Sequence, residues 1–184
     1  MNEVFFRDNI WVVVSGKKNE MTDFDKKELN KYDPLVLPER KKMILNFQDE
    51  QAIHGLGWTH SFHLPNPGIW TEGNISTLLF KFNNKINEYY IIKIKLGSLI
   101  SKKNKPINFS VSVNDVFIKK FSLKSINELN ENSIELKLKK ELITEDVHYI
   151  KFKINNPVSP LELFQSPDAR KLGLLIKSIE ILTY

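Results

Sequence analysis

The clearest pattern along this chain is the alternation of apolar and polar residues in short segments. In residues 107–113, isoleucine, phenylalanine and valine alternate with asparagine and serine. Residues 133–138 and 148–154 alternate in the same way, with lysine or glutamate at most of the polar positions. Because a period of two places alternate side chains on opposite faces of a β-strand, these segments are predicted to be strands with one buried face.

About nine such strands are expected after residue 42, joined by turns rich in asparagine, glycine and proline. Residues 114–115, Asn-Asp, separate two of the strands and predict a tight hairpin. Short, evenly spaced strands with one polar face favour an all-β fold, an antiparallel β-sandwich of the jelly-roll-like kind. The main predicted strands are residues 43–47, 76–82, 89–96, 107–113, 116–123, 133–138, 148–154 and 172–182.

The first 40 residues have a different pattern and are interpreted as an N-terminal extension or partial subdomain. Residues 3–15 are rich in β-branched and aromatic side chains, which favours one or two strands. Residues 22–32 favour a short helix, which the prolines at 34 and 38 end. The predicted domain organisation is therefore residues 1–40 as the extension and residues 41–184 as the β-sandwich.

One stretch interrupts the pattern of strands. Residues 55–73 contain four glycines, two prolines and two of the three tryptophans of the chain. So many chain-breaking residues predict an irregular loop without a regular element. A loop with such large aromatic side chains is either a cap folded over the core or a platform for a ligand.

Composition narrows the classes of function. The chain has 184 residues, a net charge of +5 and no cysteine, which suits one globular domain without disulfides or cysteine metal sites. No basic run is interleaved with aromatic residues, so no nucleic-acid partner is expected. No apolar run is long enough to span a bilayer and no signal-peptide pattern is present, so a cytoplasmic location is expected.

Two separated groups of motifs resemble a known family. The first is Gly-Trp-Thr at residues 57–59 with Gly-Ile-Trp-Thr-Glu-Gly at 68–73. The second is Pro-Val-Ser-Pro at 157–160 with Asp-Ala-Arg-Lys-Leu-Gly at 168–173. Over residues 43–182 the chain looks like the accessory β-sandwich domain found beside bacterial glycosyltransferases and phosphoglycerol-transferase-like proteins of surface-polysaccharide synthesis.

That resemblance implies an association with surface glycans and does not imply a reaction. One departure stands out within residues 55–73. The family pattern often has a glutamate between its two tryptophan motifs, whereas this chain has His-Ser-Phe-His at residues 60–63.

Two interpretations of Trp58 and Trp70 stay open. An indole face can stack on the C–H face of a pyranose, and the indole N–H can donate to a hydroxyl, so the two rings are candidate sugar platforms. In the alternative, both rings are buried anchors beneath a cap.

The charged residues of the motifs are also open to two interpretations. Glu72, Asp168 and Arg170 are candidates for contacts with sugar hydroxyls. Alternatively, Asp168 and Arg170 form a structural ion pair that fixes residues 160–170 against the tryptophan loop, because a partly buried arginine favours a bidentate carboxylate partner. With a histidine added, the predicted ligand-binding set is Trp58, His60, Trp70, Glu72, Asp168 and Arg170.

The histidines at positions 54, 60 and 63 raise the question of a metal site, since neutral imidazole is a good metal ligand. Their spacing lacks the His-x-His pair with a following glutamate that metal-binding cupins use. No metal and no cofactor are therefore expected.

Three functions remain in view. The leading hypothesis is a non-catalytic carbohydrate-binding module linked to bacterial surface-glycan biosynthesis, with a glycan as ligand and a glycosyltransferase as candidate partner. The second is a structural or protein-interaction β-sandwich accessory to a glycosyltransferase. The third is a small jelly-roll enzyme, for which the sequence offers neither a nucleophile elbow nor a phosphate-binding glycine loop.

Overall fold

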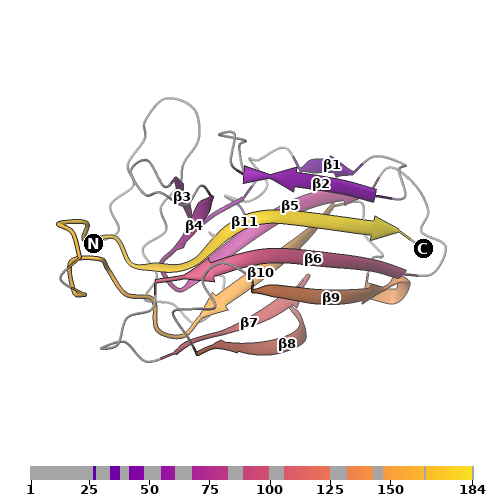
Figure 1. Cartoon of the computed structure of the whole chain (residues 1–184). Helices are drawn as coiled ribbons and strands as arrows, with labels where there is room; N and C mark the ends of the chain where they lie inside the picture. Colours follow the sequence, from indigo (N-terminus) through magenta and orange to yellow (C-terminus); the bar gives the residue numbers. More distant parts are fainter. Residues whose placement is uncertain are drawn as a thin grey trace.

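The chain is described by a computed structural model that covers residues 27, 34–37, 42–47, 55–60, 68–82, 89–99, 106–124, 132–142, 147–163 and 165–183. Its strands form two sheets packed face to face (Figure 1). The five-stranded sheet contains, in spatial order, β1 (Leu35–Leu37), β5 (Ile75–Phe82), β10 (Val147–Ile154), β7 (Ile107–Val113) and β8 (Val116–Leu123). The six-stranded sheet contains β3 (Trp58–His60), β4 (Ile69–Glu72), β11 (Leu172–Thr183), β6 (Tyr89–Ser98) and β9 (Ser133–Lys139), with β2 (Lys42–Asn46) paired to β11.

The architecture confirms the predicted all-β sandwich. Every strand pair is antiparallel except β1 and β5, which run parallel. One short 3₁₀ turn, η3 (Lys140–Leu142), follows β9. Among the residues that the structure describes, no helix is long and apolar enough to cross a membrane.

The alternating patterns produce the core as expected. Along β7 and β9, buried and less buried residues follow one another without interruption, and the apolar set faces the opposite sheet. Two of the four outer positions of β9, and two of the four of β10, are lysines. Burial of these apolar faces is the main stabilising term, because the outer faces stay hydrated while the inner faces leave water.

The predicted hairpin between β7 and β8 is present. Asn114 and Asp115 both have positive φ, at 47° and 65°, which is the conformation that a two-residue turn requires. Asparagine and aspartate tolerate this conformation better than most residues do. The hairpin ends in an exposed apolar tip, where Val116 is 48% and Phe117 is 58% exposed.

The N-terminal predictions are largely outside the described residues. The strands expected in residues 3–15 lie there, and so does the helix expected in residues 22–32, apart from Lys27, which is helical. Residues 35–37 belong to the predicted extension, yet they form β1 and pair with Phe80, Lys81 and Phe82 of β5.

The prediction that residues 55–73 hold no regular element is wrong. The stretch contains β3 and β4, which pair with each other and join the six-stranded sheet through β11. Strands of three and four residues are too short to show a period of two. The glycines beside them led the whole stretch to be interpreted as an irregular loop.

The glycines of this stretch let the chain lie directly against β5. Gly57 has φ +77°, and a Cβ built there would be 2.2 Å from the carbonyl oxygen of Ile75. A Cβ on Gly55 would be 1.9 Å from the carbonyl oxygen of Thr77. Between them, Leu56 accepts the Thr77 N–H at 2.9 Å, so the segment borders one sheet before it enters the other as β3.

The two phenylalanines at opposite extremes of exposure test the assignment of the core. Phe152 is fully buried and Phe117 is 58% exposed, so the same substitution should have very different effects. We expect Phe152→Ala to lower the free energy of unfolding by roughly 3–5 kcal/mol through lost transfer energy and a cavity. Phe117→Ala should change it by no more than about 0.5 kcal/mol in urea denaturation. Equal losses for both variants would contradict the assigned inner and outer faces.

Candidate functional site

Trp58 lies inside the sandwich. It is 2% exposed, and its ring meets the ring of Phe152 edge to face, with centroids 5.9 Å apart and planes at 77°. Its Nε1–H donates to the carbonyl oxygen of Thr77 at 2.6 Å, so the polar end of the indole is satisfied within the protein. Both the ring and its hydrogen-bonding group are therefore occupied.

Trp70 lies on the other face of the same strand pair. It pairs with Thr59 across β3 and β4, and strand alternation directs it away from the side that Trp58 occupies. It is 4% exposed and packs with Leu172, Leu175 and Leu99 in a small second cluster. Among the described residues its Nε1–H has no hydrogen-bond partner.

Neither tryptophan presents a ring face to solvent, so the structure does not offer the predicted stacking platforms. The burial of both favours the alternative, in which both rings are buried anchors. Trp58 anchors β3 in the main core, and Trp70 anchors β4 against the cluster on the outer side of the six-stranded sheet.

The predicted contact between the two motif regions is confirmed. The backbone N–H of Gly73 donates to the carbonyl of Lys171 at 2.8 Å. Thr71, which is fully buried, accepts the backbone N–H of Leu174 at 2.8 Å through its hydroxyl. This bond satisfies a donor at the irregularity between Leu172 and Leu175, where β11 changes register against β4.

The loop before β11 is held by its own polar contacts. Ser159 and Glu162 form a reciprocal pair: the Ser159 N–H donates to the Glu162 carboxylate at 3.0 Å, and the Glu162 N–H donates to the Ser159 hydroxyl at 3.1 Å. Lys171 forms an ion pair with the same carboxylate. The contact with Lys171 is the main reason that the pKa of Glu162 lies below its ordinary value.

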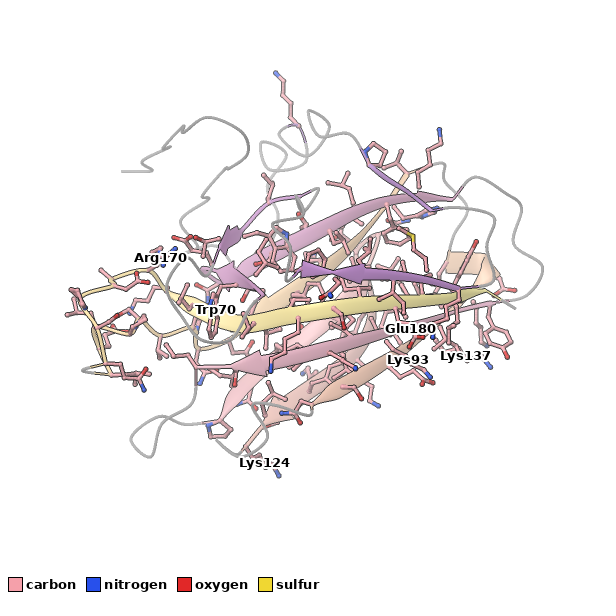
Figure 2. All side chains as sticks on the ribbon, turned by 45° about the horizontal axis from the view of Figure 1, so that its top comes forward. Trp70, Lys93, Lys124, Lys137, Arg170 and Glu180 are labelled. Atoms are coloured by element: carbon pink, nitrogen blue, oxygen red, sulfur yellow. The ribbon has the colours of Figure 1, made fainter. Side chains whose placement is uncertain are left out.

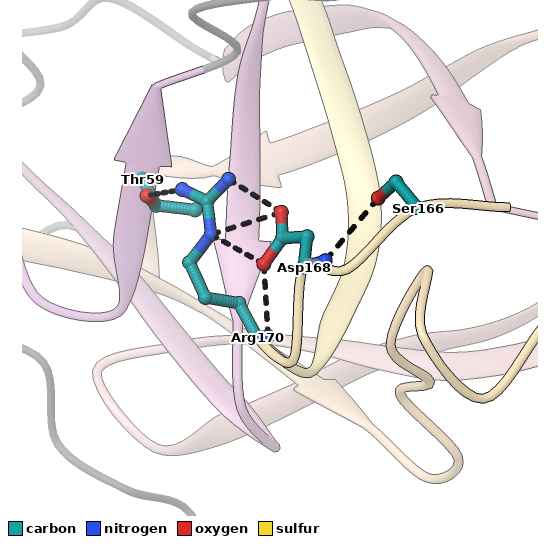
Figure 3. A network of polar contacts seen from close by, with 4 residues as sticks. All are labelled: Thr59, Ser166, Asp168 and Arg170. Carbon is teal, nitrogen blue, oxygen red and sulfur yellow. Dashed lines mark hydrogen bonds and ion pairs between the residues drawn. The ribbon is translucent and has the colours of Figure 1, made fainter.

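At the end of this loop Asp168 and Arg170 form the predicted ion pair (Figure 3). The Arg170 Nε–H donates to both carboxylate oxygens, at 2.9 and 3.1 Å, and Nη2–H donates to Oδ2 at 2.6 Å. The backbone N–H of Arg170 also donates to Oδ1 at 3.0 Å. These hydrogen bonds lower the pKa of Asp168 and raise the pKa of Arg170.

The guanidinium also reaches the tryptophan loop. Nη1–H of Arg170 donates to the hydroxyl of Thr59 at 2.6 Å, across 111 positions of sequence. Thr59 was absent from the predicted set, although the sequence carried a signal for it. Both motifs have threonine directly after tryptophan, and the structure uses Thr59 and Thr71 to receive bonds from the second motif region.

Glu72 completes the cluster on the outer face of β4. Burial raises the pKa of its carboxyl above the ordinary value, whereas the nearby Arg170 and a hydrogen bond from the Thr59 hydroxyl lower it, and Asp168 raises it. Glu72 and Thr59 lie on the same face of the β3–β4 pair, beside the guanidinium. Thr59, Glu72, Asp168 and Arg170 are called the rim cluster below.

Of the six predicted residues, four come together, Trp58 lies apart, and the side chain of His60 is outside the described set. Figure 2 shows Trp70 and Arg170 at the end of the sheet where β11 begins, far from Lys93, Lys137 and Glu180. Glu72 and Asp168 join them there through the contacts above. Trp58 is separated from the rim cluster because it faces the core. The backbone of His60 pairs with Ile69, and its side chain lies outside the described set.

Of the three histidines considered as metal ligands, only His60 lies within the described backbone. His54 and His63 are outside the described residues. Within the described ranges, no group of three or more histidine, aspartate or glutamate side chains is placed to hold a metal ion.

Comparisons with known proteins give distant structural likeness. No family model and no curated protein match the sequence. Among similar solved structures is the Cry4Aa mosquito-larvicidal toxin of Bacillus thuringiensis, with 12% identity and a TM-score of 0.49 over 82% of this chain, which spans 25% of the toxin. These values do not place the chain in the toxin family.

Carbohydrate-binding modules are also among the similar structures. The family 6 module of the LamC laminarinase of Zobellia galactanivorans has 13% identity and a TM-score of 0.44, over 77% of this chain and all of the module. A family 35 module from an environmental isolate has 11% identity and a TM-score of 0.47, over 76% and 91% of the two chains. The likeness does not assign this chain to either family.

The two tryptophans predict different responses to the same substitution. Trp58→Phe removes the donor to a buried carbonyl, whereas Trp70→Phe removes a buried N–H that lacks a described partner. We expect Trp58→Phe to cost about 1–3 kcal/mol more free energy of unfolding, because an unpaired buried polar group carries its desolvation penalty. Chemical denaturation of both variants measures the difference. A larger loss for Trp70→Phe would contradict the assigned hydrogen bond.

The raised pKa of Glu72 predicts a specific pH dependence of stability. A folded-state pKa above that of the unfolded chain means that the folded protein favours the protonated carboxyl of Glu72. The stabilising contribution of this group is therefore fully present below pH 4.5 and is lost as the pH rises through the folded-state pKa. We expect Glu72→Gln to raise the melting temperature at pH 7, and the gain to vanish towards pH 4. The exposed Glu141→Gln, with the same change in charge, serves as the control. A gain that is the same at both pH values would refute the burial effect.

Proposed function

We propose that this chain is a non-catalytic carbohydrate-binding module whose ligand contacts are made by the rim cluster. The observation that supports the proposal is the composition and exposure of that cluster. The Arg170 guanidinium joins the Asp168 carboxylate to the Thr59 hydroxyl, beside the Glu72 carboxyl, with the Arg170 side chain 39% and the Asp168 side chain 24% exposed. Partly exposed charged groups that are already fixed in position suit recognition of a polar ligand.

The chemistry of the cluster matches the hydroxyl groups of a sugar. Carboxylates accept hydrogen bonds from hydroxyls, and guanidinium N–H groups donate to them. Bonds with a charged partner are shorter and stronger than bonds between neutral groups. The network between Asp168, Arg170 and Thr59 holds these groups before a ligand arrives, so little side-chain freedom remains to be lost on binding.

In this proposal the tryptophans have a supporting role. Trp70 lies on the same face of β4 as Glu72 and packs this strand against Leu172 and Leu175. Trp58 fixes β3, which carries Thr59, to the core. Sugar contacts are thus assigned to the polar side chains, and the stability of the platform is assigned to the aromatic ones.

The motif resemblance supports a finer proposal about the setting. The matching motifs lie at residues 57–59, 68–73, 157–160 and 168–173, and the rim cluster draws on three of them. We propose that the module serves bacterial surface-polysaccharide synthesis and works beside a glycosyltransferase. Surface polysaccharides are therefore the first ligands to test.

A second candidate is a protein-interaction module accessory to a glycosyltransferase. It is favoured by Val116 and Phe117, which are exposed at the start of β8, the last strand of the five-stranded sheet. Exposed apolar side chains beside an unpaired strand edge suit contact with another protein. Phe117→Ser should weaken such a contact and leave sugar binding unchanged.

The sugar-binding proposal is tested on a glycan array that includes bacterial surface polysaccharides, followed by calorimetric titration of the best ligands. Arg170→Lys keeps the positive charge and removes the planar fork that bonds Asp168 and Thr59 together. We expect affinity to fall about tenfold or more, as the loss of a charged hydrogen bond predicts.

Two controls keep this test specific. Glu141 follows the end of β9, which pairs with the start of β6 and lies away from the rim cluster. Glu141→Gln removes one negative charge there and should leave sugar binding unchanged. Melting curves must show that Arg170→Lys is folded at the titration temperature. Absence of binding to every glycan, or unchanged affinity in folded Arg170→Lys, would refute the proposed function.

A further inference from the structure

Arg170 keeps two hydrogen-bond donors beyond those that hold the rim cluster together. A guanidinium has five N–H groups. Nε–H and one N–H of Nη2 donate to Asp168, and one N–H of Nη1 donates to Thr59. Within the described residues no acceptor is assigned to the second N–H of Nη1 or of Nη2. The side chain is 39% exposed, which leaves these donors accessible to a ligand.

An acceptor lies close to these donors. The Thr59 hydroxyl accepts a bond from Nη1 at 2.6 Å. Because Thr59 pairs with Trp70, Glu72 lies diagonally across from Thr59 on the same face of the β3–β4 pair. Burial raises the pKa of the Glu72 carboxyl, which is nevertheless close enough to Arg170 for the guanidinium to lower that pKa. A ligand that spans the guanidinium and this carboxyl must offer an acceptor and a donor side by side. Neighbouring hydroxyls of one sugar ring do so, because each hydroxyl both donates and accepts.

The charge of the cluster discriminates between sugars. Two carboxylates and one guanidinium leave one negative charge uncompensated when all three are ionised. Lys171 does not compensate it, because its ammonium pairs with Glu162. A carboxylate on the ligand would add a second uncompensated negative charge within a few ångströms of Glu72 and Asp168.

Resting on the proposed function, we propose that the rim cluster selects uncharged sugars with adjacent free hydroxyls and discriminates against uronic acids. One hydroxyl donates to Glu72, and its neighbour accepts from the free N–H groups of Arg170. Asp168 already occupies the Nε–Nη2 side of the guanidinium, so a ligand carboxylate cannot take that bidentate position. The partial burial of Glu72 acts in the same direction, since its environment already disfavours negative charge.

The test uses matched neutral and acidic oligosaccharides on the full 184-residue chain. Oligogalactosides and oligogalacturonides form one pair, and oligomannosides and oligomannuronates form another. We expect the neutral member of any bound pair to bind at least about tenfold more tightly at low salt. Raising the ionic strength should narrow the ratio, because salt screens the repulsion of the acidic member.

Glu72→Gln is the informative variant. It keeps the size of the side chain and removes the uncompensated charge, so the preference for the neutral member should shrink to about twofold. Glu141→Gln removes an equal charge elsewhere and should leave the ratio unchanged. Equal or tighter binding of the acidic member by the unmodified protein overturns the selectivity while the proposed function stands. Binding of neither series overturns the selectivity, and the proposed function falls with it only when no glycan of the array binds.

Discussion

The hydrogen bond from the Trp58 indole to the carbonyl of Thr77 joins the two sheets at the point on which the rest of the fold depends. Trp58 opens a strand of the six-stranded sheet, and Thr77 lies within the five-stranded one. The segment at residues 55–57 can follow β5 closely only because Gly55 and Gly57 lack side chains. Since β3 leaves from this corner, the position of Thr59, and through it of Arg170, is set by a contact in the core.

Burial of the tryptophans separates the residues that support the fold from those to which we assign recognition. The aromatic residues that looked suited to a sugar are enclosed, at 2% and 4% exposure. The groups that reach solvent beside them are charged. A surface of this kind recognises a ligand by direction and charge, since hydrogen bonds need a fixed geometry that stacking does not. Arg170 accordingly has two tasks, because it closes the loop onto β3 and also carries donors outward.

The sequence predicted the strands best where one face alone is buried. Residues 107–113 were predicted to the residue, and β9 extends one residue past its prediction, because alternation there follows directly from one buried and one hydrated face. Residues 116–123 were also predicted to the residue, but there the Asn-Asp turn marked the start of the strand, since its positions do not alternate between buried and exposed. β3 and β4 were missed because too few residues lie between glycines to repeat. For the site, the Asp168–Arg170 pair was anticipated, but Thr59 was not. The threonine that follows each tryptophan is visible in the sequence, but the role of Thr59 depends on a contact 111 positions away.

The placement of β11 has a consequence for the order in which the fold assembles. β11 pairs with β6 on one side and with β4 and β2 end to end on the other. Those three strands all precede it by more than 70 residues, so they emerge from the ribosome long before their shared partner. The β7–β8 hairpin can close locally, whereas the six-stranded sheet must wait for its central strand. Until β11 is made, the backbone edges of β2, β4 and β6 that it will cover are open to pairing with wrong strands. A chaperone would therefore matter most during this interval.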